Sequence, residues 1–125
     1  QCPDLGAAKT IKRMAGMAQN MMTDVLDAYV TRDADKADEV RLRDEELDSL
    51  YTSLFRELLT YMMENPKNIT ASTHLMFAAK NIERIGDHAT NIAENVHFLV
   101  HGQMPEEPRP KGDGSVYMTD PTADV

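Results

Sequence analysis

The chain has 125 residues, of which 42% are hydrophobic, and its 21 acids against 13 bases give a formal net charge of -8. This length suits one compact domain, and the acidic balance argues against nucleic acid as the main partner while leaving room for cations or basic protein surfaces. No apolar run approaches the ~20 residues that a membrane-spanning helix needs, so we expect no membrane insertion.

The start of the chain gives two expectations about its setting. Cys2 is the single cysteine and cannot form an internal disulfide, which favours a reducing, cytosolic location. No signal-peptide pattern is present. The sequence begins with Gln1 and not with Met, which suggests a piece of a longer protein.

Residues 4–31 predict the first helix, because apolar side chains recur there at steps of three and four residues. Asp4 is a candidate for the residue that caps the start of this helix. The stripe is rich in methionine, and we favour a methionine-rich core seam over an adaptable binding surface. Its members are Ile11, Met14, Ala18, Met21, Met22, Val25 and Tyr29.

A short polar break at 32–36 separates this helix from a second one over about 35–64, and Asp33 or Asp35 is a plausible N-cap. Within the second helix, Asp44 and Asp48 are four residues apart and border the apolar stripe, so we expect them to face a groove beside a neighbouring helix. The stripe itself comprises Val40, Leu47, Leu50, Leu54, Leu58 and Tyr61.

The second helix is expected to end at Asn65-Pro66, because proline disfavours helix in the residue before it. Asn68 or Thr70 can cap a third helix, which runs to about His101, and Gly102 suits the position just after its end.

The third helix contains the most specific stretch of the chain, residues 80–95. Glu83 and Asp87 lie one helical turn apart, and two like charges at this spacing repel unless a cation joins them or water screens them. On a helical wheel one side is apolar and carries Ile82, Ile85, Ala89, Ile92, Ala93 and Val96, and the opposite side carries Glu83, Asp87, Thr90 and Glu94.

Together the stripes predict an all-α fold, an antiparallel three-helix bundle with helices near 5–31, 35–64 and 69–101. We therefore assign residues 1–102 to one bundle domain. Residues 103–125 have no apolar periodicity and are rich in proline at their start, which predicts a flexible, disordered tail.

Several segments also resemble the PhoU family of bacterial regulators of phosphate uptake. They are N-I-E-R-I-G-D-H-A-T-N-I-A-E-N at 81–95, D-A-Y-V-T-R-D-A-D-K-A at 27–37, R-D-E-E-L-D-S-L-Y at 43–51 and L-L-T-Y-M-M-E-N-P at 58–66. The agreement spans about residues 5–102 and implies the second of the two similar three-helix repeats from which PhoU proteins are built, without the first.

The resemblance implies a non-catalytic adaptor that holds the phosphate-starvation response off when phosphate is plentiful. The implied partners are the ATPase subunit of a phosphate ABC transporter and a phosphate-sensing histidine kinase. The implied location is the cytoplasm, at the inner membrane through these partners. The resemblance leaves open whether the chain forms a homodimer.

The family's E/D-x-x-x-D pattern, implicated in binding metal clusters, falls on Asp44/Asp48 and on Glu83/Asp87. Independently of the family, carboxylates on two helices suit hard cations, or iron and manganese. We expect iron, with manganese, zinc or magnesium as alternatives. Asn91, Glu94 and Asn95 are candidates to orient the ligands or bind water. Other interpretations stay open: the two pairs bind metal separately, they bridge to another subunit or to the absent first repeat, or Glu83 and Asp87 are solvated acids paired with Lys80 and Arg84.

Two other function classes fit the sequence less well. A di-iron carboxylate oxidase needs two Glu-x-x-His motifs on four helices, and Glu94 and His97 supply only one. A histidine phosphotransfer module would use His74 or His88, but neither has a basic and glycine pattern beside it. Gly86 inside a helix costs up to ~1 kcal/mol against alanine, which suggests either a closely approaching helix or a tight metal site.

Overall fold

The computed structural model describes residues 5–102, and these form three long α-helices in the predicted order. The elements are α1 (Leu5–Thr31), α2 (Ala34–Glu64), the 3-10 turn η1 (Pro66–Asn68) and α3 (Ile69–His101). This confirms the all-α three-helix bundle and its connections. Asp4 and the predicted tail at 103–125 lie outside the described residues.

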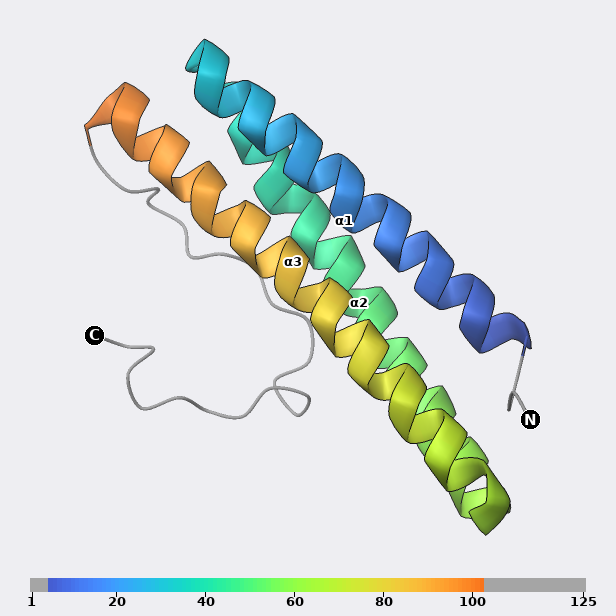
Figure 1. Cartoon of the computed structure of the whole chain (residues 1–125). Helices are drawn as coiled ribbons and strands as arrows, with labels where there is room; N and C mark the ends of the chain where they lie inside the picture. The colour runs from blue at the N-terminus through green and yellow to red at the C-terminus, as the bar shows by residue number, and fades with distance from the viewer. Residues whose placement is uncertain (1–4, 103–125) are drawn as a thin grey trace.

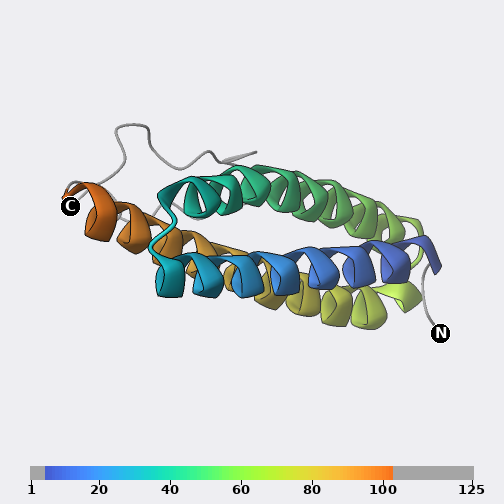
Figure 2. The ribbon, with the colours of Figure 1, turned by 90° about the horizontal axis from the view of Figure 1, so that it is seen from above.

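The three helices lie side by side, α1 and α3 running in one direction and α2 in the other (Figures 1 and 2). Every helix contacts both of the others, and the α2–α3 interface is the most extensive. At the end of the bundle that carries η1, the α2–α3 hairpin reaches beyond the start of α1 (Figure 1).

Local side chains explain where the helices begin and end. Asp33 caps α2, its carboxylate accepting a hydrogen bond from the backbone N–H of Lys36 at 3.1 Å. Gly102 ends α3 in the left-handed region at φ 73°, which confirms its predicted place. Asn68 does precede α3, but its side chain donates to the Tyr61 carbonyl at 3.1 Å and does not cap the helix.

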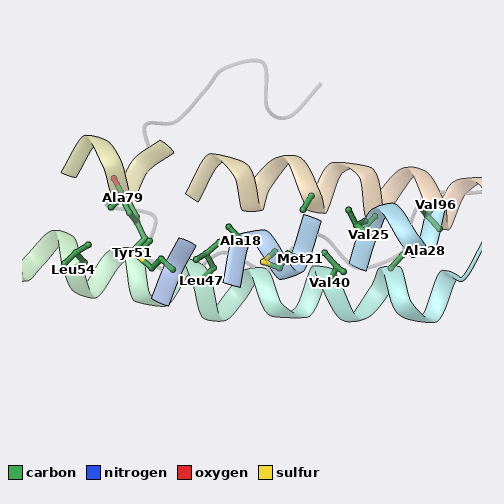
Figure 3. Close-up of a cluster of buried hydrophobic side chains, with 14 of the residues drawn as sticks. Ala18, Met21, Val25, Ala28, Val40, Leu47, Tyr51, Leu54, Ala79 and Val96 are labelled. Atoms are coloured by element: carbon green, nitrogen blue, oxygen red, sulfur yellow. The ribbon is translucent and has the colours of Figure 1, made fainter. Parts of the chain in front are cut away.

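The core runs along the axis between the helices, with Ala18, Met21 and Val25 of α1 facing Val40 and Leu47 of α2 (Figure 3). Most of the apolar residues predicted for α1 and α2 are buried or half-buried, which confirms the methionine-rich core seam. Tyr29 was predicted in this stripe and is 45% exposed. It lies at the end of α1, where its ring packs under the Arg32 guanidinium, 5.5 Å from the ring centroid.

The predicted buried side of α3 is confirmed only in part: Ala89, Ala93 and Val96 are buried, but so are residues of the side expected to face solvent. Glu83 and Thr90 are buried, whereas Ile85 is 43% exposed and Ile82 is only half-buried. The physical reason is that α3 packs against two helices, and the face that meets α2 carries small and polar residues. Gly86 lies directly against Leu47 and Asp44 of α2, and the buried Thr90 satisfies its hydroxyl by donating to the Gly86 carbonyl at 3.0 Å.

Within residues 5–102, none of the helices is both long enough and apolar enough to cross a membrane.

Candidate metal centre between helices α2 and α3

The candidate site is built around Gly86 of α3, which lies directly against Leu47 and Asp44 of α2. A methyl group placed on Gly86 would lie 2.5 Å from Leu47 Cδ2 and 3.0 Å from Asp44 Oδ1. Both distances are shorter than ordinary van der Waals contact, so a side chain here would push the helices apart. Close approach of a neighbouring helix is therefore the reason for glycine at this position.

This close approach brings the two predicted acid pairs to one interface. Asp44 and Asp48 lie one turn apart on α2, and each is only 1% exposed. The contact of Asp44 with Gly86 places it beside the helical segment that carries Glu83 and Asp87. Glu83 is likewise 1% exposed, and Asp87 is half-buried. The interpretation of Glu83 as a solvated surface acid is therefore wrong.

Burial dominates the electrostatics of Glu83. The pKa of the Glu83 carboxyl is raised from 4.5 to about 7, first by burial and next by a hydrogen bond with the Asp87 carboxyl. Two carboxyl groups can share a hydrogen bond only when one of them holds a proton. Near neutral pH the Glu83 carboxyl is therefore partly protonated, and in the protonated form it shares its proton with Asp87.

One cation already lies beside Glu83. Lys80 donates a hydrogen bond from Nζ to Glu83 Oε1 at 2.9 Å and sits 5.5 Å from the centroid of the Tyr51 ring on α2. This ion pair opposes the rise in the Glu83 pKa. Burial raises the pKa of the Tyr51 hydroxyl, which keeps that group neutral.

Tyr51 was not predicted as part of the site. It lies seven residues after Asp44 and three after Asp48, so all three share one face of α2. That spacing is the signal in the sequence that places it beside the acids. The residues of α3 that were predicted to orient the ligands are less buried than the acids: Asn91 and Asn95 are exposed, and Glu94 is half-buried.

The residues fit a hard cation in chemistry and in placement, since three buried carboxyl groups and one half-buried group belong to one helix interface. Their present rotamers do not converge. Among residues 5–102, no three His, Cys, Asp or Glu side chains form a group that could hold a metal ion as they stand. Binding would require Glu83 to exchange its proton or the Lys80 ammonium for the metal.

The alternative sites look different in the structure. The described part of the chain supplies three helices, and not the four of a di-iron carboxylate protein. Glu94 and His97 do not pair as ligands there, because His97 faces Asp38 of α2, with 3.3 Å between Nδ1 and Oδ1. His74 and His88 are exposed on α3.

A separate apolar groove of about 340 Å³ lies between α1 and α3. Met22, Leu26, Ile82 and Ile85 line it together with Ala15, Ala18, Gln19 and Thr23. The partly exposed Ile82 and Ile85 of the apolar stripe of α3 therefore form part of its lining. It lies along the α1 side of α3, whereas the acids lie on the α2 side.

Comparison of the sequence with known proteins identifies similar proteins of one family. A model of the PhoU domain matches residues 11–96. The chain is 57% identical over 106 residues to a phosphate-specific transport system accessory protein PhoU homolog from Rhizobium meliloti. It is 53% identical over 111 residues to the homolog from Caulobacter vibrioides, and 48% identical over 113 residues to that from Xylella fastidiosa.

These alignments cover 85%, 89% and 90% of this chain but only 45%, 48% and 48% of the relatives. The chain thus spans about half the length of the curated relatives it matches. No solved structure gives a significant match.

Proposed function

Because the chain belongs to the PhoU family, we propose that it acts as a non-catalytic adaptor and negative regulator of phosphate uptake and phosphate-starvation signalling. The observation that carries this proposal is the family match over residues 11–96, which covers nearly all of the helical bundle. Its relatives are named as accessory proteins of a phosphate-specific transport system, which supports the same role.

The proposed partners are the ATPase subunit of a phosphate ABC transporter and a phosphate-sensing histidine kinase. The proposed location is the cytoplasmic side of the inner membrane, reached through these proteins. The acidic balance of the chain, -8 overall, suits basic protein surfaces as docking partners.

We further propose that Asp44, Asp48, Glu83 and Asp87 hold a metal, iron first and manganese, zinc or magnesium as alternatives. Carboxylate oxygens are the ligands these hard or borderline cations accept. A bound cation would supply positive charge that neutralises the acids and links α2 to α3. Asn91 and Glu94, on the next turn of α3, would hold water or orient the ligands.

The regulatory role has a direct test in cells. In a bacterium whose own gene for this accessory protein is deleted, we expect the gene that encodes this chain to restore repression of phosphate-starvation genes in high phosphate. Reporter expression measures the effect, and immunoblotting shows that the protein is present. If the protein is present and folded but repression does not return, the proposed role is wrong.

The metal proposal predicts that iron or manganese raises the thermal midpoint of the protein, because a ligand that binds only the folded state stabilises it. At a metal concentration 100 times the dissociation constant, the gain is ~2.7 kcal/mol. Asp87→Asn keeps the side-chain shape but removes one charge, so it should weaken binding without changing helicity. Anaerobic calorimetric titration, with circular dichroism alongside, measures both quantities.

The matched control for this titration is Glu45→Gln, which removes one negative charge from the exposed side of α2, next to Asp44 in sequence. It should bind metal as the unaltered protein does. If no metal changes either signal at millimolar concentration, and Asp87→Asn behaves like the control, these acids do not form a metal site.

A further inference from the structure

A second group of metal-binding side chains lies at the opposite end of α3 from η1, and the PhoU assignment does not involve it. His97 and His101 are one helical turn apart, and their ring centroids are 4.5 Å from each other. Imidazoles at this spacing on a helix face the same way and can bind one metal ion together. His101 is exposed and the His97 side chain is 17% exposed, so the pair is accessible from solvent.

A carboxylate of α2 holds the first of these rings in place. His97 Nδ1 lies 3.3 Å from Asp38 Oδ1, and Arg41 lies 3.8 Å from the same carboxylate oxygen. When Nδ1 donates its hydrogen to Asp38, the lone pair of Nε2 is left for a metal. This is the arrangement by which carboxylates orient metal-binding histidines in proteins.

The surroundings favour a cation on balance. His101 lines an open hollow of about 430 Å³ with Asp33 and Asp35, which are negative, and with Arg32, which is positive. Asp38 adds a further negative charge beside His97. The site also lies in the last turn of α3, where the helix dipole presents its negative end.

From this geometry we propose that His97 and His101, with Asp38 as the residue that positions His97, form a site for a divalent transition metal of the imidazole-binding class. Nickel, copper and zinc belong to this class. Two histidines supply two ligands, and water completes the coordination sphere. This site is separate from the four acids proposed above, since those offer only oxygen ligands.

The probe for this site is Ni²⁺ alone, added to the whole chain with Cys2 changed to Ser so that the thiol cannot compete. Calorimetry at pH 7.5 should show one ion bound per chain. Nitrogen NMR signals of His97 and His101 should shift together, and those of His74 and His88 should not. At pH 5 the binding should be lost, because imidazole must be unprotonated to bind metal.

Three variants locate the site. Asp38→Asn should weaken Ni²⁺ binding by about 10–100-fold, the usual effect of losing an orienting partner. His101→Asn removes a ligand and should weaken binding more than Asp38→Asn does. His74→Asn, also exposed on α3 but with no histidine one turn away, should bind like the unaltered chain. If His101→Asn binds as tightly as His74→Asn, or if no Ni²⁺ binds one-to-one, the proposal is wrong whatever the outcome for iron or for phosphate regulation.

Discussion

Gly86→Val should destabilise the bundle by about 2–3 kcal/mol, the range expected for adding carbon atoms to a closely packed interface. The first carbon of the new side chain would already lie 2.5 Å from Leu47 Cδ2 and 3.0 Å from Asp44 Oδ1. Leu47 is completely buried and cannot turn away into solvent. A loss of this size should lower Tm by roughly 8–24 °C in a bundle of this length. Thermal unfolding followed by circular dichroism measures it.

Gly16→Val is the matched control, because Gly16 lies on the exposed side of α1 with nothing within 4 Å of the added carbon. It should change stability by no more than about 0.5 kcal/mol, as surface substitutions usually do. A second test uses Leu47→Ala, which alone should cost about 2–5 kcal/mol. Combined with Gly86→Val it should cost less than the sum of the two, since the new side chain fills the vacated space. Strict additivity would show that the two residues do not compete for that space.

Glu83→Gln should stabilise the metal-free protein at pH 8 and have little effect at pH 4.5. In the unaltered chain, burial raises the pKa of Glu83 to about 7, above its ordinary value of 4.5. The folded state therefore holds this proton more tightly than the unfolded state does. The resulting stability is fully present below about pH 4.5 and is lost as the pH rises through about 7.

The size of this effect follows from the same two pKa values, because one pKa unit is worth ~1.4 kcal/mol, so ionising buried Glu83 costs roughly 3 kcal/mol. Glutamine never ionises, and the variant should thus exceed the unaltered chain by up to this amount at pH 8. Urea unfolding in metal-free buffer from pH 4.5 to 8 measures the difference. Glu45→Gln controls for the loss of one surface charge. A stability difference between Glu83→Gln and the unaltered chain that does not change with pH would contradict the prediction.

The sequence predicts the helices of this protein well because their ends depend on local chemistry. The Asp33 cap, the Asn65-Pro66 break and Gly102 after α3 all act within a few residues of the bonds they make or prevent. The apolar seam of α1 was equally readable, because α1 buries one continuous face. None of these features depends on which other helix lies nearby.

The buried side of α3 could not be predicted in the same way. Periodicity finds the most apolar side of a helix, and for α3 that side includes Ile82 and Ile85, which are only partly covered. The side that packs most closely is decided by α2, because Leu47 and Asp44 need the space that Gly86 leaves. A single helix pattern contains no information about the shape of its neighbour.

The same limit explains the partial prediction of the candidate site. The four-residue spacing of each acid pair was visible, and the helix interface that buries Asp44, Asp48 and Glu83 follows from the bundle. The pairing of Lys80 with Glu83, three residues apart on α3, could be read from the spacing, but the position of Tyr51 beneath Lys80 depends on the register between α2 and α3. Register is fixed by packing along the whole interface and cannot be obtained from the spacing within one helix.

The end of the α2–α3 hairpin is less stable against local opening than the rest of the bundle. Beyond Leu58 on α2 and before Ala79 on α3, Ser72 is the only described residue that is buried, and the apolar side chains there are partly or largely exposed. Segments with few buried apolar contacts open at a lower free energy than the core does. The hairpin tip around η1 should therefore open and close while the part of the bundle that contains the buried Met21, Leu47 and Ala93 remains intact. The bundle is then one cooperative unit with a looser end, and a protease or a binding partner can engage that end without unfolding the rest.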